Sequence, residues 1–274
     1  MSAARRPAGP ARVCVVGALG RMGERVRAAV AAEPGLVLAS LLESPGHPGV
    51  GSEADGLRVG SDPGSALAAA DVAIDFSVPS ATLAALAAAA AAGVPYVTGT
   101  TGFAPDQRAE LARHARHVPV VAAANFSVAV NVLGHLAVQA AELLGPTYDA
   151  EIVELHHAGK QDAPSGTALW LGEAIAAARG TSLEKVGVLS REGETGARPP
   201  GAIGIQALRG GDNPGEHVVH FVGPGERVEL AHRSFTRDHF ARGSVRAARW
   251  LLGRPPGLYD MADVLGLARP GAGA

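Results

Sequence analysis

Short apolar runs alternate with segments of helical character along the first half of the chain. The runs are rich in Val, Ile and Leu and predict strands at residues 12–17, 36–43, 71–76, 94–98 and 118–123. The segments between them predict helices at residues 21–32, 80–92 and 105–117. Residues 44–65 are rich in Gly, Pro and Ser, which is typical of a loop. This alternation predicts βαβ units and a doubly wound parallel sheet of the Rossmann type.

The pattern changes after about residue 126, and the last three predicted strands follow one another without helices between them. Helices are predicted at residues 128–144, 167–178 and 240–252, and strands at residues 148–155, 203–209, 217–222 and 227–234. The last three strands are joined by turns rich in Gly and Pro. Such a run favours an antiparallel or mixed sheet, and therefore a second α+β domain.

Composition and charge exclude several classes of protein. The chain has 274 residues, of which 47% are hydrophobic, and a formal net charge of −2. This charge gives no support for nucleic-acid or membrane-surface binding. Arg242, Arg246 and Arg249 share one face of a predicted helix, but no aromatic residues are interleaved with them, which favours a solvated face. The single cysteine, Cys14, excludes an intrachain disulfide and a cysteine zinc cluster.

No segment has the pattern of a signal peptide or a membrane span. The apolar run of residues 81–92 is short and dominated by alanine, which indicates a helix packed on a core. We therefore expect a cytoplasmic protein with no membrane partner.

A glycine-rich turn lies between the first predicted strand and the first predicted helix. Gly17, Gly20 and Gly23 follow a G-x-x-G-x-x-G spacing, and Glu43 closes the second predicted strand. Glycines allow a backbone to approach a pyrophosphate, the helix N-terminus favours its negative charge, and a carboxylate at Glu43 can accept hydrogen bonds from ribose hydroxyls. The motif predicts a dinucleotide site; the alternative is a structural turn that binds no nucleotide.

The densest cluster of reactive residue types lies in residues 154–168. His156, His157 and Lys160 fall within five residues, and Lys160 is one of only two lysines in an arginine-rich chain. Pro-Ser-Gly-Thr then opens a helix that Ser165 can cap. A histidine supplies a general acid near neutral pH, and a helix N-terminus holds a carboxylate. The block indicates an acid/base site for an anionic substrate.

Two other interpretations of this block remain open. The histidines could ligate a metal, but adjacent residues on a strand face opposite sides, and no Cys or H-x-x-x-H partner accompanies them. They could also be purely structural. We predict no metal.

Several further segments complete a recognisable order of motifs. They are Ile74-Asp75-Phe76-Ser77, Gly99-Thr100-Thr101-Gly102, Ala123-Ala124-Asn125-Phe126-Ser127, Ser190-Arg191-Glu192-Gly193, Arg209-Gly210-Gly211-Asp212 and Gly215-Glu216-His217. Together with the glycine turn and residues 154–168, they resemble the 4-hydroxy-tetrahydrodipicolinate reductase family (formerly dihydrodipicolinate reductase) of the diaminopimelate–lysine pathway. The resemblance covers nearly the whole chain, and residues 154–168 are its most specific part.

The resemblance implies roles for individual residues. Gly17, Ala18, Leu19, Gly20, Arg21 and Met22 are expected at the cofactor pyrophosphate, Glu43 at the adenosine ribose, and Gly99, Thr100, Thr101, Ala123, Ala124, Asn125 and Phe126 around the nicotinamide. His156 is the expected proton donor and acceptor, Lys160 the second proton donor, and His157, Gly166 and Thr167 the residues that hold the substrate carboxylates. Arg237 matches an arginine near the site in relatives.

The resemblance also implies a domain organisation, a substrate and an assembly. It predicts a dinucleotide-binding domain of residues 1–126 and 237–274, with residues 1–11 as a disordered tail, and a substrate-binding and oligomerisation domain of residues 127–236. Hinges are expected near residues 127 and 236. The implied substrate is a cyclic imine dicarboxylate, which receives hydride at C4 and a proton at C3. Relatives are commonly homotetramers.

One departure from the family pattern concerns the cofactor. Some relatives carry Arg after the acid that matches Glu43 and use it on the 2′-phosphate of NADPH, whereas this chain has Ser44. Glu43 would repel a 2′-phosphate and Ser44 offers no compensating charge, so NADH is the predicted preference, with NADPH still accepted. Alternatives to this function are another two-domain reductase of a small dicarboxylate, such as an aspartate dehydrogenase, and a non-catalytic dinucleotide sensor.

Overall fold

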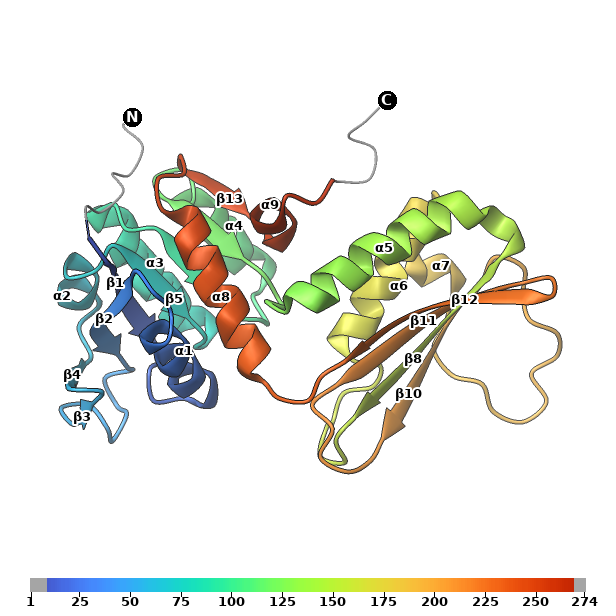
Figure 1. Cartoon of the computed structure of the whole chain (residues 1–274), viewed down its shortest axis with the longest axis horizontal. Coiled ribbons are helices and arrows are strands. Elements are labelled where there is room, and N and C mark those ends of the chain that lie inside the picture. Colours follow the sequence, from blue (N-terminus) through green and yellow to red (C-terminus); the bar gives the residue numbers. More distant parts are fainter. Residues whose placement is uncertain (1–8, 269–274) are drawn as a thin grey trace. The chain divides into compact units, whose positions relative to one another are not determined.

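A computed structural model describes residues 9–268 and divides the chain into two compact units (Figure 1). The first unit comprises the chain up to Val128 together with Asp238–Leu267, and the second comprises Ala129–Arg237. Residues 1–8 of the predicted disordered tail lie outside the described residues. The prediction was wrong for Ala11, which already begins a strand because it pairs with Leu36.

The first unit is built on a sheet with β1 at its centre. Within the described residues the strand order is β13-β7-β6-β5-β1-β2-β4-β3. The strands are β1 (Ala11–Val16), β2 (Leu36–Leu42), β3 (Glu53–Ala54), β4 (Leu57–Gly60), β5 (Val72–Asp75), β6 (Tyr96–Thr98), β7 (Pro119–Ala122) and β13 (Gly257–Tyr259). Neighbours pair in parallel except β3 with β4. The chain winds outward from β1 in both directions, which confirms the predicted doubly wound sheet.

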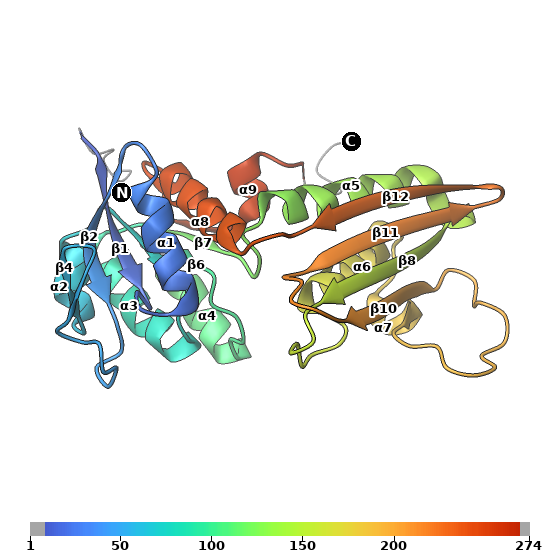
Figure 2. The same ribbon diagram turned by 60° about the horizontal axis from the view of Figure 1, so that its bottom comes forward.

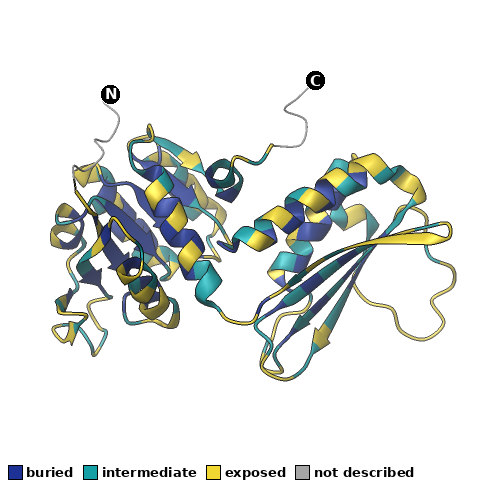
Figure 3. Ribbon diagram, viewed as in Figure 1, coloured by how far each residue is buried: buried dark blue, intermediate teal, exposed yellow. Residues whose placement is uncertain are grey.

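Helices cover both faces of this sheet. They are α1 (Arg21–Ala31), α2 (Pro63–Ala68), α3 (Pro79–Ala92), α4 (Pro105–His114), α8 (Asp238–Leu251) and α9 (Met261–Leu265). Because side chains alternate along a strand, Val13 and Val15 of β1 join one core with α1 and α8, whereas Cys14 and Val16 join another with α3 and α4. Figure 3 shows the buried positions concentrated in the strands and on the sheet-facing sides of the helices.

The second unit is a mixed sheet with helices on one face, as predicted. The strands are β8 (Asp149–His156), β9 (Gly187–Val188), β10 (Ile203–Arg209), β11 (Glu216–Gly223) and β12 (Glu226–Arg233), in the order β12-β11-β8-β10-β9. Strand β8 runs parallel to β10 and antiparallel to β11. Helices α5 (Val128–Leu144), α6 (Gly166–Ala178) and α7 (Leu183–Val186) complete the unit. Figure 2 shows α5 and α6 on the same face of the sheet.

Several short elements depart from the sequence prediction. Residues 44–65 are not a continuous loop, because they contain β3, β4 and the start of α2. Strand β4 is stabilised by pairing with the edge of β2, and α2 begins where Asp62 accepts hydrogen bonds from the backbone of Gly64 and Ser65. The elements α7, β9, β13 and α9 were also missed, since none exceeds five residues.

Helix α5 and the turn after it are long and apolar enough to cross a membrane by length and composition alone (Val128–Thr147). The sequence predicts a helix at residues 128–144 but no membrane span there. Its residues Leu133, Ala137 and Ala141 are buried in the core of the second unit, against the sheet and α6. This packing is that of a core helix, so the segment gives only weak support for a membrane span.

The structure gives the loop of residues 189–202 a partner that the sequence did not reveal. Arg191 donates two hydrogen bonds to the carboxylate of Glu151, at 2.7 and 2.8 Å, and Arg198 donates a third at 3.0 Å. Glu151 lies on β8, on the face of the sheet opposite the helices. The two arginines therefore fasten this loop to the second sheet.

Candidate active site

Strand β8 carries two polar side chains on its buried face. Alternate residues of this strand are buried, and the buried set runs Ala150, Ile152, Glu154 and His156. Glu154 is 0% exposed and His156 is 8% exposed. A carboxylate at a position otherwise suited to an apolar residue is costly unless it is fully hydrogen-bonded.

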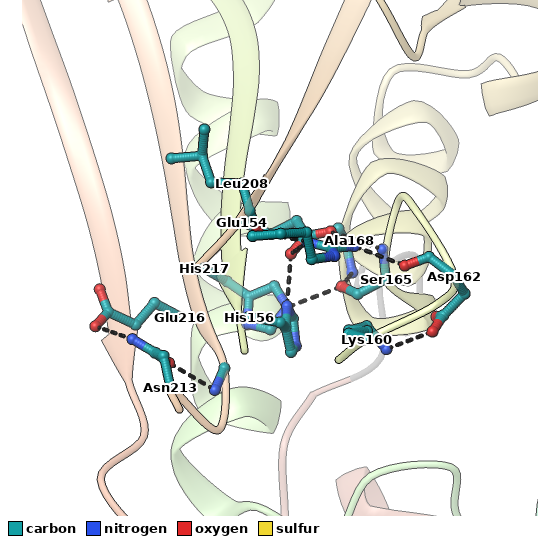
Figure 4. A network of polar contacts seen from close by, with 12 residues as sticks. Glu154, His156, Lys160, Asp162, Ser165, Ala168, Leu208, Asn213, Glu216 and His217 are labelled. Carbon is teal, nitrogen blue, oxygen red and sulfur yellow. Dashed lines mark hydrogen bonds and ion pairs between the residues drawn. The ribbon is translucent and has the colours of Figure 1, made fainter. Parts of the chain in front are cut away.

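Glu154 meets this requirement with four donors. Arg209 of β10 donates to both carboxylate oxygens, at 2.9 Å and 2.8 Å. The backbone N–H of Ser165 donates at 3.0 Å, and Nδ1 of His156 lies 2.5 Å from Oε2 (Figure 4). Burial alone would raise the pKa of Glu154, but the hydrogen bonds from Arg209 and His156 outweigh it, and the pKa lies below its ordinary value. Glu154 is therefore an anion at neutral pH.

His156 turns its two ring nitrogens toward different surroundings. Nδ1 faces Glu154, whereas Nε2 has no hydrogen-bond partner within residues 9–268. A Cβ atom at Gly215 would come within 2.8 Å of Nε2, and Gly215 has a φ of +148°. Burial lowers the pKa of His156, and the neighbouring Glu154 offsets part of that effect. Glycine at position 215 keeps the space beside Nε2 open.

A second buried histidine lies beside the first. The rings of His217 and His156 are 5.3 Å apart and nearly perpendicular, and Nε2 of His217 lies 3.1 Å from Oγ of Ser165. Ser165 also caps α6 as predicted, accepting a hydrogen bond from the backbone of Ala168 at 3.2 Å. Burial lowers the pKa of His217 to about 3, so its ring is neutral at physiological pH.

This histidine makes the stability of the protein depend on pH. An unfolded chain binds a proton at His217 below a pKa of about 6.5, whereas the folded chain does so only below about 3. The stabilisation is therefore complete above pH 6.5 and is lost as pH falls, by about 1.4 kcal/mol per pH unit.

We expect the free energy of unfolding of the wild type to fall roughly 2 kcal/mol more than that of His217→Gln between pH 6.5 and pH 5. Urea unfolding followed by tryptophan fluorescence measures both slopes. Equal slopes for the two proteins would show that His217 takes up its proton as readily in the folded state.

The loop after β8 holds the remaining residues of the predicted block. Nζ of Lys160 donates to Asp162 at 2.8 Å, and the backbone N–H of His157 donates to the carbonyl of Asn213 at 2.8 Å. Nη2 of Arg237 lies 3.4 Å from Nε2 of His157. The structure thus brings Arg237 to His157.

Helix α6 begins directly after this loop. Its first residues are Gly166 and Thr167, behind the cap at Ser165. The first backbone N–H groups of a helix have no partner inside the helix, and they favour a negative charge. The end of β8 and the start of α6 therefore place a histidine, a lysine and an anion-holding helix terminus close together.

The predicted cofactor residues lie in the first unit. Gly17 joins β1 to α1 with a φ of +71°, which favours glycine. A Cβ atom at Gly23 would come within 2.1 Å of the Gly17 carbonyl, so α1 can approach the turn only because residue 23 is glycine. Oε1 of Glu43 accepts a hydrogen bond from the backbone of Leu19 at 2.7 Å. The turn and the acid thus form one compact structure, which fits a dinucleotide.

The other predicted cofactor residues follow neighbouring strands. Residues 99–101 follow β6 and residues 123–126 follow β7, so both groups lie at the carboxyl edge of the sheet with the glycine turn. A Cβ atom at Gly99 would come within 2.1 Å of the Phe76 ring. Phe126 is 1% exposed and lies in the core, so its side chain is not available to a ligand.

The geometry does not suggest a metal centre. Within residues 9–268, no group of three or more His, Cys, Asp or Glu side chains lies close enough to hold a metal ion. His156 and His157 have separate partners, Glu154 and Arg237.

Three residues of the site have no role in the sequence analysis: Glu154, Arg209 and His217. They come from β8 and from the two strands that pair with it on either side, β10 and β11. Each of the three belongs to one of the motifs that carry the family resemblance, and this is the signal in the sequence that could have identified them.

Comparison with known proteins gives the family. The N-terminal model of dihydrodipicolinate reductase matches residues 11–126, and the C-terminal model matches residues 129–265. The chain belongs to the dihydrodipicolinate reductase family.

Relatives in this dihydrodipicolinate reductase family match over most of their length. The 4-hydroxy-tetrahydrodipicolinate reductase of Anaeromyxobacter dehalogenans strain 2CP-1 is 52% identical over 264 residues, which cover 93% of this chain and 98% of the relative. That of Geobacter sulfurreducens is 47% identical over 264 residues, covering 93% and 99%. Among solved structures, a dipicolinate-bound dihydrodipicolinate reductase from Paenisporosarcina sp. TG-14 has a TM-score of 0.76 at 25% identity, covering 92% of this chain and 98% of its own.

Proposed function

We propose that this protein reduces 4-hydroxy-tetrahydrodipicolinate to tetrahydrodipicolinate with NAD(P)H, in diaminopimelate and lysine biosynthesis. The observation that carries the proposal is the position of His156, which is held by Glu154 and leaves Nε2 open beside the start of α6. Relatives that are about half identical over 93% of the chain carry the name of this reductase.

The charges of the site suit a cyclic imine dicarboxylate. Such a substrate needs holders for two carboxylates and a proton donor. We assign one carboxylate to the N-terminus of α6, at Gly166 and Thr167, and the other to His157 with Lys160. Arg237, which lies 3.4 Å from His157, adds a positive charge there. The structural relative that binds dipicolinate, itself a dicarboxylate, supports this substrate class.

The reaction assigns a separate task to each group. A bound nicotinamide cofactor supplies the hydride that C4 of the substrate ring accepts after water has left. The resulting enamine then takes up a proton at C3, and we assign Nε2 of His156 as the donor of this proton. Lys160 offsets the negative charge of the substrate and is the second proton donor. After water has left, one hydride and one proton add across a carbon–carbon double bond, so that over the whole reaction the C4 hydroxyl is replaced by hydrogen and one water is released.

We assign the dinucleotide to the predicted domain of residues 1–126 and 237–274, most of whose described residues form the first unit, and the substrate to residues 127–236. Within this domain we assign the pyrophosphate to residues 17–22 and the adenosine ribose to Glu43. The nicotinamide half is assigned to residues 99–101 and 123–126. The fit rests on the tight turn at Gly17 and Gly23 and on the carboxylate that this turn holds.

NADH is the proposed preference between the two nucleotides. Glu43 accepts hydrogen bonds from the backbone of Leu19 and Ser44, which fix its carboxylate at the end of β2. A 2′-phosphate beside a fixed carboxylate is repelled by roughly 1–2 kcal/mol after solvent screening, about a tenfold effect. We therefore expect kcat/KM for NADH to exceed that for NADPH by about tenfold.

Ser44→Arg should reverse this ratio, because a guanidinium can pair with the 2′-phosphate. Ser52→Arg adds the same charge at an exposed position of the same segment and serves as the control. Initial rates with both cofactors measure the ratio, and a wild-type preference for NADPH would refute the assignment of Glu43 and Ser44.

We also propose a cytoplasmic homotetramer assembled through the second sheet. Within the described residues no helix covers the face of this sheet opposite α5 and α6, and Leu208 and Val222 are 51% and 41% exposed. Exposed apolar side chains on an uncovered sheet favour association with another copy. Sedimentation velocity measures the assembly directly.

Growth of a diaminopimelate-requiring bacterial strain that lacks its own reductase tests the proposed function in cells. We expect the wild-type gene to restore growth without diaminopimelate and the His156→Ala gene to restore it poorly. A sensor that binds dinucleotides without turnover would restore no growth. Failure of the wild-type gene to restore growth would therefore reject the proposed reaction.

A further inference from the structure

We propose that Glu154 is the positioning residue of the general acid: its hydrogen bond to Nδ1 of His156 fixes the ring and directs proton exchange to Nε2. The inference rests on the proposed function, which gives His156 its role as the acid. It adds a residue that acts through His156, because Glu154 itself is fully buried and cannot touch the substrate.

Glu154 must be an acceptor on both of its carboxylate oxygens. Arg209 and the backbone N–H of Ser165 have only hydrogens to offer, and together they donate three hydrogen bonds to this carboxylate. An uncharged amide at this position would turn N–H groups toward other N–H groups. The site is therefore built for a carboxylate and not for a glutamine.

The proton of the Glu154–His156 hydrogen bond belongs to His156. A carboxylate without a proton can only accept, so Nδ1 of His156 must donate across the 2.5 Å contact. A neutral ring then carries its lone pair on Nε2, and a protonated ring has its second proton there. Since Gly215 leaves the space beside Nε2 open, proton exchange is confined to that atom.

Glu154 also contacts the start of α6, where we assign one substrate carboxylate. Glu154 accepts a hydrogen bond from the backbone of Ser165, which caps α6, and Oγ of Ser165 also contacts His217 (Figure 4). One carboxylate thus fixes both the histidine ring and the start of the helix. The distance between the proton donor and the bound carboxylate is set through Glu154.

Charged and titratable groups from several elements face the ring of His156. They are Glu154 on its own strand, Lys160 on the following loop, Arg209 on β10 and His217 on β11. Glu154 raises the pKa of His156, whereas Lys160 and Arg209 lower it. Loss of the Glu154 charge removes the group that raises the pKa of His156 and leaves Lys160 and Arg209, which lower it. A smaller share of His156 is then protonated at a given pH.

A double-mutant cycle separates positioning from a purely structural role. We expect Glu154→Gln to lower kcat roughly 10- to 100-fold, with the alkaline limb of the kcat/KM profile moved to lower pH. In the His156→Ala background the same substitution should change kcat less than about twofold, because the proton donor that Glu154 positions is absent, whereas the loss of its contact with the start of α6 should change KM in both backgrounds. An equal loss of kcat in both backgrounds, or no loss in either, would overturn the proposal.

The chain offers a matched control on the same strand. Glu151 also lies on β8 and accepts hydrogen bonds from two arginines, but it faces the other side of the sheet. Glu151→Gln should keep the kcat and pH profile of the wild type. A loss as large as that of Glu154→Gln would mean that any broken glutamate–arginine pair on β8 harms the enzyme, which rejects a specific role for Glu154.

A third variant restores the charge at position 154. Glu154→Asp retains the carboxylate and should recover part of the lost kcat.

A spectroscopic measurement keeps the test independent of activity. With ¹⁵N-labelled histidine, the NMR signals of His156 should show the Nδ1–H form in the wild type and a mixture of forms in Glu154→Gln. If the wild type shows the Nε2–H form, the proposal fails even when the enzyme is active. If turnover is absent but Nδ1–H is found, the proposed function fails and the positioning stands.

Discussion

Replacing His156 with alanine should lower kcat about 100-fold or more, while NADH binding stays within about twofold of the wild type. The ring is the proposed proton donor, because Glu154 holds Nδ1 and leaves Nε2 open. The proposed cofactor residues belong to the first unit and His156 to the second, so we expect the substitution to leave the dinucleotide site intact. Steady-state kinetics and NADH fluorescence titration measure the two quantities.

His135→Ala is the control for this variant, because it removes a half-buried histidine from α5 of the same unit. It should keep nearly full activity. Turnover at the wild-type rate by His156→Ala would remove this residue from the role of general acid.

The pH dependence gives His156 a second signature. Burial lowers the pKa of His156 below its ordinary value of 6.5, and an acid works only while it is protonated. The kcat/KM profile of the free enzyme should therefore decline as pH rises through a pKa below 6.5. A bound dianionic substrate favours the protonated ring, which moves the limb of the kcat profile to higher pH.

Replacing Lys160 with methionine should lower kcat/KM about 10- to 100-fold. Nζ of Lys160 is held by Asp162 at 2.8 Å, on the loop between His156 and α6. It is a compact cation on a flexible stem that can turn from Asp162 to a substrate carboxylate. Lys160→Arg keeps the charge, so KM should stay closer to normal, but its longer planar fork should recover little of kcat.

The other lysine of the chain provides the control. Lys185 lies in the last turn of α7 in the same unit, and Lys185→Met should leave the kinetics unchanged. Activity of Lys160→Met within twofold of the wild type would show that the substrate is held without this cation.

Long elements were predictable because their patterns are local. Helix α5 at Val128–Leu144 and strand β10 at Ile203–Arg209 have the predicted bounds, since each carries an uninterrupted apolar pattern. Strands β3 and β4 were not predictable, because β4 is held by pairing with β2, which lies outside its own sequence. Short elements of this kind gain their stability from neighbours rather than from propensity.

The site was predictable only as far as it is contiguous. Residues 154–168 contain both proposed proton donors and the cap of α6, and they stand out in the sequence as one block. The role of Arg209 depends on the parallel register that sets it opposite His156, and the role of His217 on the antiparallel register that sets it opposite Glu154. Such pairings between distant residues cannot be derived from one sequence.

The most direct test of the proposed reaction is the loss of nicotinamide absorbance with substrate generated in place. Aspartate semialdehyde and pyruvate are condensed by the preceding synthase, and the purified protein is added with NADH or NADPH. The account predicts substrate-dependent oxidation that is faster with NADH and about 100-fold slower with His156→Ala. No oxidation above the enzyme-free background with either cofactor, from folded protein that binds NADH, would contradict it.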